Sequence, residues 1–159
     1  RLTHLPEPEY KTVSVPALFT KLERLLQAEP RSERVVYCDG KADKSTGKEL
    51  QVYGDANLLT LALINLIRNA LQAVEGQEDG IVRVDTCAGA TGHLLITITD
   101  NGPGIPPERL SAIFTPFFPP KPGGSGIGLP ISQRIMQLHG GQLSVSSIPN
   151  VRTEFRMEF

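Results

Sequence analysis

Proline and glycine are concentrated in one stretch of this 159-residue chain. Eight of the thirteen prolines and six of the fifteen glycines fall between Gly102 and Pro130. A long helix or a central strand does not tolerate so many of these residues, because proline lacks a backbone N–H and both interrupt regular structure. A loop of this length inside a compact domain is usually a functional lid or a linker. Phe114, Phe117 and Phe118 give the segment apolar anchors, so we interpret it as a lid.

The rest of the chain alternates between helix patterns and strand patterns. The boundary signals are proline in a first helical turn, a polar cap at Asp55, and glycines just past helix ends. These signals predict helices over 16–28, 56–74 and 127–139, strands over 11–15, 34–39, 81–86, 94–99, 142–147 and 153–159, and an exposed turn over 40–48. This order favours a mixed β-sheet with helices packed on one face.

The charge balance and the cysteines exclude several classes of protein. The 16 basic and 17 acidic side chains leave a net charge of −1, so broad electrostatic binding to nucleic acid or to an anionic membrane is disfavoured. The sequence contains no run of roughly 18 apolar residues of the kind that could span a bilayer. Cys38 and Cys87 are far apart and lack metal-ligand spacing, so we expect two buried thiols in a reducing compartment, and a cytoplasmic location. The sequence is compatible with a full-length protein that is soluble and with one that is anchored to a membrane.

The first candidate cluster lies on the long helix over 56–74. Asn65 and Asn69 are four residues apart and share a face, and Arg68 and Gln72 extend the same polar stripe. Asparagine is a poor helix former, which indicates a role beyond the helix itself. The stripe is either a solvated face or, with an amide oxygen directed into a cleft, part of a Mg²⁺ site.

The second cluster is Asp100-Asn101-Gly102-Pro103-Gly104, where a predicted strand ends. These residues are common turn formers, so an ordinary turn is one interpretation. In the other, a buried Asp100 carboxylate accepts a hydrogen bond from an exocyclic amine such as that of adenine. Gly102 and Gly104 would then let the backbone approach a ring closely.

The third cluster is the run from Lys121 to Leu129, Lys-Pro-Gly-Gly-Ser-Gly-Ile-Gly-Leu, which leads into the helix predicted over 127–139. Backbone N–H groups of a glycine loop at a helix N-terminus can cradle phosphate, and a flexible hinge is the alternative. The run lacks the Gly-Lys-Ser/Thr of a Walker A loop and the preceding strand of a dinucleotide fingerprint.

Taken in order, these clusters resemble the N, G1, F and G2 boxes of the ATP-binding catalytic domain of bacterial sensor histidine kinases, most closely the nitrogen-regulation type. The superfamily includes gyrase, MutL-type proteins and Hsp90-type chaperones. The boxes correspond to Asn65–Ala73, Asp100–Ile105, Phe114–Phe118 and Gly124–Leu129, and the resemblance spans about residues 11–159.

The resemblance implies an α/β (α+β) two-layer sandwich of the Bergerat type, in which a mixed sheet is backed by about three helices. Residues 1–10 would be a connector from a dimerisation domain, residues 11–159 the catalytic domain, and about 101–127 the ATP lid. Neither the histidine motif of the phosphoacceptor helix nor a substrate histidine is present, so the substrate would lie on a separate dimerisation domain. A response regulator would act downstream. The fragment would be a monomer, whereas the full-length protein would be a dimer.

The resemblance also implies ATP and Mg²⁺ as cofactors and assigns residues to them. Asn69 would bind the metal, Asp100 would hold the adenine amine, Thr153 would assist it, and Lys121 would reach the γ-phosphate. The remaining nucleotide contacts would come from residues of the boxes, namely Ala73, Gly102, Gly104, Ile105, Phe117, Gly124, Ser125, Gly126, Ile127, Gly128 and Leu129.

Asn65 distinguishes a kinase from a hydrolase. The gyrase, MutL and chaperone branches carry glutamate there, whose carboxylate activates water, and asparagine cannot take that proton. Transfer to an imidazole needs mainly positioning and charge neutralisation, which favours a histidine kinase with Asn65 and Lys121 as catalytic residues. A nucleotide-binding module without turnover and a serine kinase of the anti-sigma-factor type are the alternatives.

Two segments depart from the family pattern. The usual closing Pro-Gly-x-Gly-Thr reads Pro-Asn-Val-Arg-Thr over 149–153. Asn150 adopts a left-handed conformation more readily than Arg152, so we expect the turn beside the adenine pocket to differ. Pro119 and Pro120 stand where threonine is common and would stiffen the lid.

Overall fold

The computed structural model describes residues 5–38, 47–88, 93–114 and 128–159. In this part of the chain, five strands form one sheet in the order β2-β4-β5-β7-β6. Strands β2 and β4 are parallel, and the other neighbours are antiparallel, so the predicted mixed sheet is confirmed. The bounds are Val35–Cys38 (β2), Val82–Ala88 (β4), Leu94–Asp100 (β5), Gln142–Ile148 (β6) and Arg152–Glu158 (β7).

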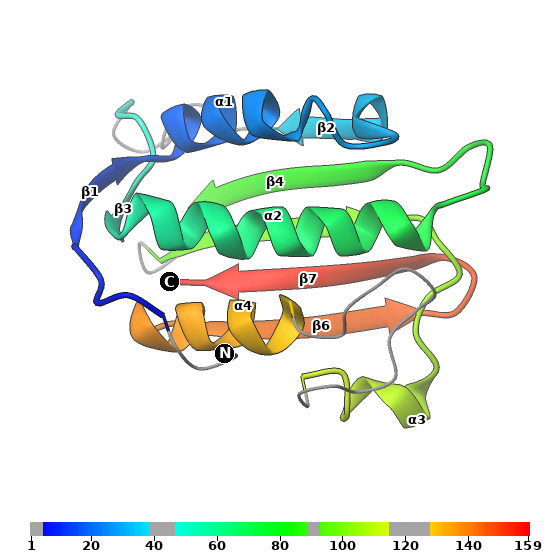
Figure 1. Cartoon of the computed structure of the whole chain (residues 1–159). Coiled ribbons are helices and arrows are strands. Elements are labelled where there is room, and N and C mark those ends of the chain that lie inside the picture. The colour runs from blue at the N-terminus through cyan, green and yellow to red at the C-terminus, as the bar shows by residue number, and fades with distance from the viewer. Residues whose placement is uncertain (1–4, 39–46, 89–92, 115–127) are drawn as a thin grey trace.

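Three helices cover one face of this sheet, which gives the predicted two-layer α/β sandwich (Figure 1). They are α1 (Val15–Leu26), α2 (Ala56–Ala73) and α4 (Gly128–Leu138). Helix α2 is central, because it contacts both other helices as well as β4 and β5. Positions along the molecule can therefore be described by the end of α2 to which they are nearer.

The starts of α1 and α2 follow from their caps. The Ser14 hydroxyl accepts from the Ala17 N–H at 3.2 Å, and Asp55 Oδ1 accepts from the Leu58 N–H at 3.0 Å. Each side chain satisfies one backbone donor that has no partner within the helix. The predicted N-cap at Asp55 is confirmed.

The core lies between α2 and the inner face of the sheet. Alternate residues of the central strands point inward, because successive side chains of a strand lie on opposite faces. The buried set includes Ile96 and Ile98 of β5, Phe155 and Met157 of β7, and Leu59, Leu63, Leu66 and Ile67 of α2. The apolar face of α2 is thus the face that packs on the sheet.

A second, two-stranded sheet lies at one end of the molecule and was not predicted. Strand β1 (Lys11–Ser14) pairs antiparallel with β3 (Gln51–Gly54), so that Val13 lies opposite Val52 and both are buried. The predicted strand over 11–15 is correct, but its partner is outside the main sheet.

Two short helices and the cysteines also differ from the predictions. A turn of 3₁₀ helix (Ser32–Arg34) precedes β2, and α3 (Pro107–Leu110) lies within the segment predicted to be lid. Proline near the start of α3 is compatible with a first helical turn. Cys38 is half-buried and Cys87 is exposed, so the expectation of two buried thiols is wrong.

Candidate functional site

A buried carboxylate marks the end of β5. Asp100, the last residue of that strand, is 3% exposed, and its Oδ1 accepts a hydrogen bond from the Gly102 N–H at 2.9 Å. Thr153 of β7 lies directly opposite Asp100 in the strand register and is 4% exposed. Opposed side chains of an antiparallel pair lie about 5 Å apart on the same face, so a carboxylate and a hydroxyl share one small region.

The turn after Asp100 is fixed by close backbone approaches. A Cβ added to Gly102 would lie 2.8 Å from the Ala73 carbonyl oxygen, so the C-terminal end of α2 leaves no space for a side chain there. Gly104 has a φ of +81°, and an added Cβ would lie 2.9 Å from Ser147 Oγ. The groups that lie close to these two glycines in this structure belong to α2 and to the end of β6.

Asn101 lies between Asp100 and Gly102, and its hydrogen bonds hold the loop that follows α2. Its side chain accepts from the Ile81 N–H at 2.8 Å and donates to the Asp79 carbonyl at 2.9 Å. Its own carbonyl accepts from the Gln77 side chain at 2.8 Å. These bonds explain why a turn-forming amide stands here, and they assign Asn101 a structural role.

The asparagines of α2 are both half-buried, on the face that sequence periodicity predicts. Asn65, Asn69 and Ala73 are each neither fully exposed nor fully buried, at successive one-turn spacing toward the end of α2 that meets Gly102. Arg68, the next polar residue on this helix, is exposed, and its Nε forms an ion pair with Glu29 Oε1 at 2.5 Å, in the segment that follows α1.

Ser147 joins the turn to the neighbouring strands, and sequence reasoning missed it. Its Oγ accepts from the Ile105 N–H at 2.8 Å, donates to the Arg152 carbonyl at 3.1 Å, and lies 3.0 Å from Thr153 Oγ1. A signal was present in the sequence, because alternation along β6 places Ser147 on the same face as the buried Leu143. A hydroxyl on the apolar face of a strand needs a hydrogen-bond partner.

The closing turn between β6 and β7 contains one residue with a left-handed backbone conformation. Asn150 has a φ of +62°, and its N–H donates to the Pro103 carbonyl at 2.7 Å, which links this turn to the segment after Asp100. Arg152 is the first residue of β7, and positive φ angles among the described non-glycine residues occur only at Arg31 and Asn150. One left-handed residue therefore suffices for this turn.

The predicted phosphate-binding segment falls mostly between the described ranges 93–114 and 128–159. Six predicted site residues lie outside the described part of the chain, namely Phe117, Lys121, Gly124, Ser125, Gly126 and Ile127, as do Phe118, Pro119 and Pro120. Gly128 begins α4, and Leu129 is half-buried against the core. The ring of Phe114 meets that of Phe155 edge to face at 6.4 Å, which agrees with its predicted role as an anchor.

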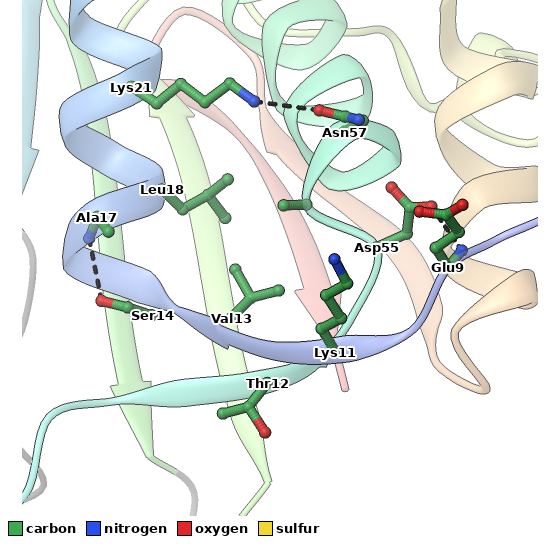
Figure 2. A pocket seen from close by; sticks show the side chains of 11 residues that line it. Glu9, Lys11, Thr12, Val13, Ser14, Ala17, Leu18, Lys21, Asp55 and Asn57 are labelled. Carbon is green, nitrogen blue, oxygen red and sulfur yellow. Dashed lines mark hydrogen bonds between the residues drawn. The ribbon is translucent and has the colours of Figure 1, made fainter.

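A separate cavity of about 320 Å³ lies between β1, α1 and the first turn of α2 (Figure 2). Lys11, Lys21, Asp55 and Asn57 line it, and Lys21 Nζ donates to Asn57 Oδ1 at 3.2 Å. Helix α2 has 18 residues, so at 1.5 Å per residue this cavity is roughly 27 Å from the Asp100 end. The cavity and the Asp100 region are distinct places.

Two ionisable side chains, Asp55 and Tyr37, have shifted pKa values. Burial alone would raise the pKa of Asp55, but N–H groups of Glu9, Leu58 and Asn57, with His139 nearby, together hold that pKa below its usual value. Burial, with the charge of Glu23, raises the pKa of Tyr37 to about 12. Among the described residues, no group of three or more His, Cys, Asp or Glu side chains could hold a metal. A Mg²⁺ site here would need amide or phosphate oxygens, which that ion accepts.

Comparison with known proteins connects this geometry to a family. The family described as histidine kinase-, DNA gyrase B-, and HSP90-like ATPase matches residues 54–159. The sensor histidine kinase ZraS of Salmonella typhimurium (strain LT2) is 42% identical over 98 residues, which cover 62% of this chain and 21% of that protein. The sensory histidine kinase/phosphatase NtrB of Vibrio alginolyticus is 34% identical over 145 residues, which cover 86% of this chain and 40% of that protein.

Solved structures show the same architecture. The catalytic domain of histidine kinase ThkA superposes with a TM-score of 0.75 at 27% identity, over 94% of this chain and 95% of that one. Full-length ShkA, solved in complex with AMPPNP, shares the fold with a TM-score of 0.78 at 23% identity, over 99% of this chain and 32% of that one.

The chain belongs to the histidine kinase-, DNA gyrase B- and HSP90-like ATPase family, as the ordered clusters predicted. Its relatives include sensor histidine kinases, and it spans only 17% to 40% of the length of the first curated proteins that it matches. No helix in the described part of the chain is long and apolar enough to cross a membrane.

Proposed function

We propose that this domain binds Mg·ATP and transfers its γ-phosphoryl group to a histidine on the dimerisation domain of a sensor histidine kinase. The observation that carries the proposal is the buried Asp100 carboxylate opposite Thr153 at the end of β5, in a chain of this family. A carboxylate buried at a strand end needs hydrogen-bond donors. The Gly102 N–H supplies one to Oδ1, and an adenine amine supplies another.

Asn69 holds Mg²⁺ in this proposal. Its amide oxygen is a hard ligand, and Mg²⁺ commonly takes one or two protein ligands and completes its octahedron with water and substrate phosphates. Asn69 lies one turn before Ala73, whose carbonyl meets Gly102 beside Asp100. A nucleotide with its base at Asp100 would extend its phosphates along this end of α2 toward the start of α4.

The chemical step needs little acid–base assistance. The unprotonated nitrogen of a neutral imidazole attacks the γ-phosphorus, the bond to the β,γ-bridging oxygen breaks, and ADP leaves with that electron pair. The proton on the other ring nitrogen is then released to solvent. Asn65 cannot activate water as a glutamate would, so transfer to the imidazole is favoured over hydrolysis. Lys121 neutralises the negative charge that builds up on the leaving ADP as the bond to the bridging oxygen breaks.

The remaining assignments follow from this role. Residues 1–10 form the connector to a dimerisation domain, residues 11–159 form the catalytic domain, and about 101–127 form the lid. Gly124, Ser125, Gly126 and Ile127 contact the phosphates, and Phe117 anchors the lid. The full-length protein is a dimer that passes the phosphoryl group to a response regulator, and its use of ATP assigns it to the cytoplasm.

Phosphotransfer in trans tests the proposal. The domain is mixed with a histidine-bearing dimerisation domain of a related sensor kinase and radiolabelled Mg·ATP, and we expect acid-labile phosphohistidine on the partner. Lys121→Ala should lower the rate, whereas Lys11→Ala, an exposed lysine near the distant cavity, should not. Tight nucleotide binding without phosphohistidine on several such partners would instead indicate a binding module, and acid-stable phosphoserine would indicate a serine kinase.

A further inference from the structure

Ser147 takes part in three hydrogen bonds within the candidate site, one with the segment after Asp100 and two with β7. Its Oγ accepts from the Ile105 N–H at 2.8 Å, donates to the Arg152 carbonyl at 3.1 Å, and lies 3.0 Å from Thr153 Oγ1. It therefore joins the turn after Asp100 to β7. Ser147 and Thr153 are also register partners across β6 and β7.

The three contacts fix the direction of the hydrogen bond between the two hydroxyls. A serine hydroxyl has one proton and two lone pairs. The Ile105 N–H can only donate, so it occupies one lone pair, and the Arg152 carbonyl can only accept, so it takes the proton. One lone pair is left for Thr153, whose hydroxyl must then be the donor in this bond.

This direction makes Thr153 an acceptor toward everything else. Once its proton points to Ser147, Thr153 Oγ1 presents only lone pairs to the region opposite Asp100. The Asp100 carboxylate is also an acceptor when ionised. Two acceptors side by side suit an exocyclic amine, which has two N–H donors, and they repel a keto oxygen.

We propose that Ser147 is a specificity-determining residue: by fixing the direction of the Thr153 hydroxyl, it makes the site prefer a purine with a 6-amino group over a purine with a 6-keto group. The inference rests on the proposed nucleotide site and deepens it. Ser147 acts through Thr153 and is a positioning residue.

Replacement of Ser147 by alanine releases this constraint. Alanine cannot accept a hydrogen bond, so the Thr153 hydroxyl can rotate and donate to a keto oxygen. The preference for amino over keto purine should then fall, without disappearing, because the Asp100 carboxylate still favours an amine.

The test compares ADP with inosine diphosphate, in which a keto oxygen replaces the 6-amino group of the base and N1 carries a proton. Calorimetric titration of wild type should give tighter binding of ADP. In Ser147→Ala, we expect the ratio of the dissociation constant of inosine diphosphate to that of ADP to fall about tenfold. This is the size of effect expected when one hydroxyl, that of Thr153, becomes free to donate a hydrogen bond to the keto oxygen. Ser146→Ala, an exposed serine on the other face of β6, should leave the ratio unchanged.

A double-mutant cycle separates specificity from stability. Thr153→Val should lower the ratio as Ser147→Ala does, and Ser147→Ala should then add nothing in the Thr153→Val background. Thr153→Ser keeps the hydroxyl and should keep the ratio. These Thr153 variants also test the inference if Ser147→Ala does not fold.

Two results would overturn the inference. One is a Ser147→Ala protein that binds both nucleotides more weakly with an unchanged ratio, and the other is a Thr153→Val protein with the wild-type ratio. In either case ADP binding by wild type would leave the proposed function standing. Failure of wild type to bind ADP at all would instead remove the proposed function itself.

Discussion

The main-chain N–H of Asp55 donates a hydrogen bond to Nε2 of His139, 84 residues further along the chain, at 3.0 Å. The other ring nitrogen of His139, Nδ1, lies 2.7 Å from the Ile135 carbonyl, which can only accept, so Nδ1 carries the proton. The N-cap of α2 is thus tied to the C-terminal end of α4, the helix that directly follows the predicted lid.

His139→Ala should destabilise the protein by about 1–3 kcal/mol, because the Asp55 N–H loses its partner in a part-buried place. Urea unfolding followed by circular dichroism measures the loss. His93→Ala is the matched control: its ring nitrogen also meets a main-chain carbonyl, that of Phe159 at 2.8 Å, but in an exposed place, so a much smaller loss is expected. Equal losses in the two variants would contradict a special role for the Asp55–His139 bond.

Asp55 should contribute stability that disappears in acid. Its pKa is lowered in the folded protein, since three backbone N–H groups and the nearby His139 outweigh the effect of burial. The folded state therefore binds fewer protons than the unfolded state, and the contribution is present above the unfolded pKa of about 4 and lost as pH falls through the folded pKa.

Asp55→Asn checks this sign. The difference in unfolding free energy between wild type and Asp55→Asn should be larger near neutral pH than below about pH 4. Asp79→Asn, at an exposed aspartate, is the matched control for the substitution itself. A difference for Asp55→Asn that stays constant with pH would rule out the contribution.

Gly104 and Gly76 separate backbone strain from crowding. Both have positive φ angles, +81° and +79°, but an added Cβ meets Ser147 Oγ at 2.9 Å at Gly104 and nothing within 4 Å at Gly76. Gly76→Ala should therefore cost about 1 kcal/mol for the left-handed conformation alone. Gly104→Ala should cost about 1–3 kcal/mol more, because the segment after Asp100 must shift away from β6. Equal losses of unfolding free energy in Gly76→Ala and Gly104→Ala, measured by thermal or urea unfolding, would contradict crowding at Gly104.

Asn69→Ala should reduce the Mg²⁺ dependence of nucleotide binding. Titration of ADP with and without Mg²⁺ measures this dependence, which one lost ligand should weaken by about tenfold or more. Arg68→Ala is a suitable control on the same helix, because the Arg68 side chain is engaged in an ion pair with Glu29. A Mg²⁺ dependence that survives in Asn69→Ala would exclude Asn69 as a ligand.

The regular parts of this fold follow from local patterns in the sequence. Helix α2 has a cap, an apolar face and a length that no strand could match, and strands β5 and β7 alternate clearly. Asp100 was identifiable because turn formers follow directly on such a strand. These signals lie within a few residues of one another, so a single sequence displays them.

The missed features depend on distant partners. Strand β3 has four residues, and its role becomes clear only when Val52 pairs with Val13 across 39 positions of chain. The link from Ser147 to Ile105 spans 42 positions, and that between Asp55 and His139 spans 84. Local propensity contains no information on which segments meet, which is why these contacts escaped prediction.

The most direct test of the central claim is a calorimetric titration of ADP into wild type and Asp100→Asn. The account predicts that wild type binds ADP in preference to GDP, and that Asp100→Asn loses about 2 kcal/mol or more of binding free energy while it keeps the wild-type unfolding temperature within a few degrees. Equal binding of ADP by the two proteins would contradict the assignment of Asp100 to the adenine amine. Absence of binding by wild type would contradict the nucleotide site as a whole.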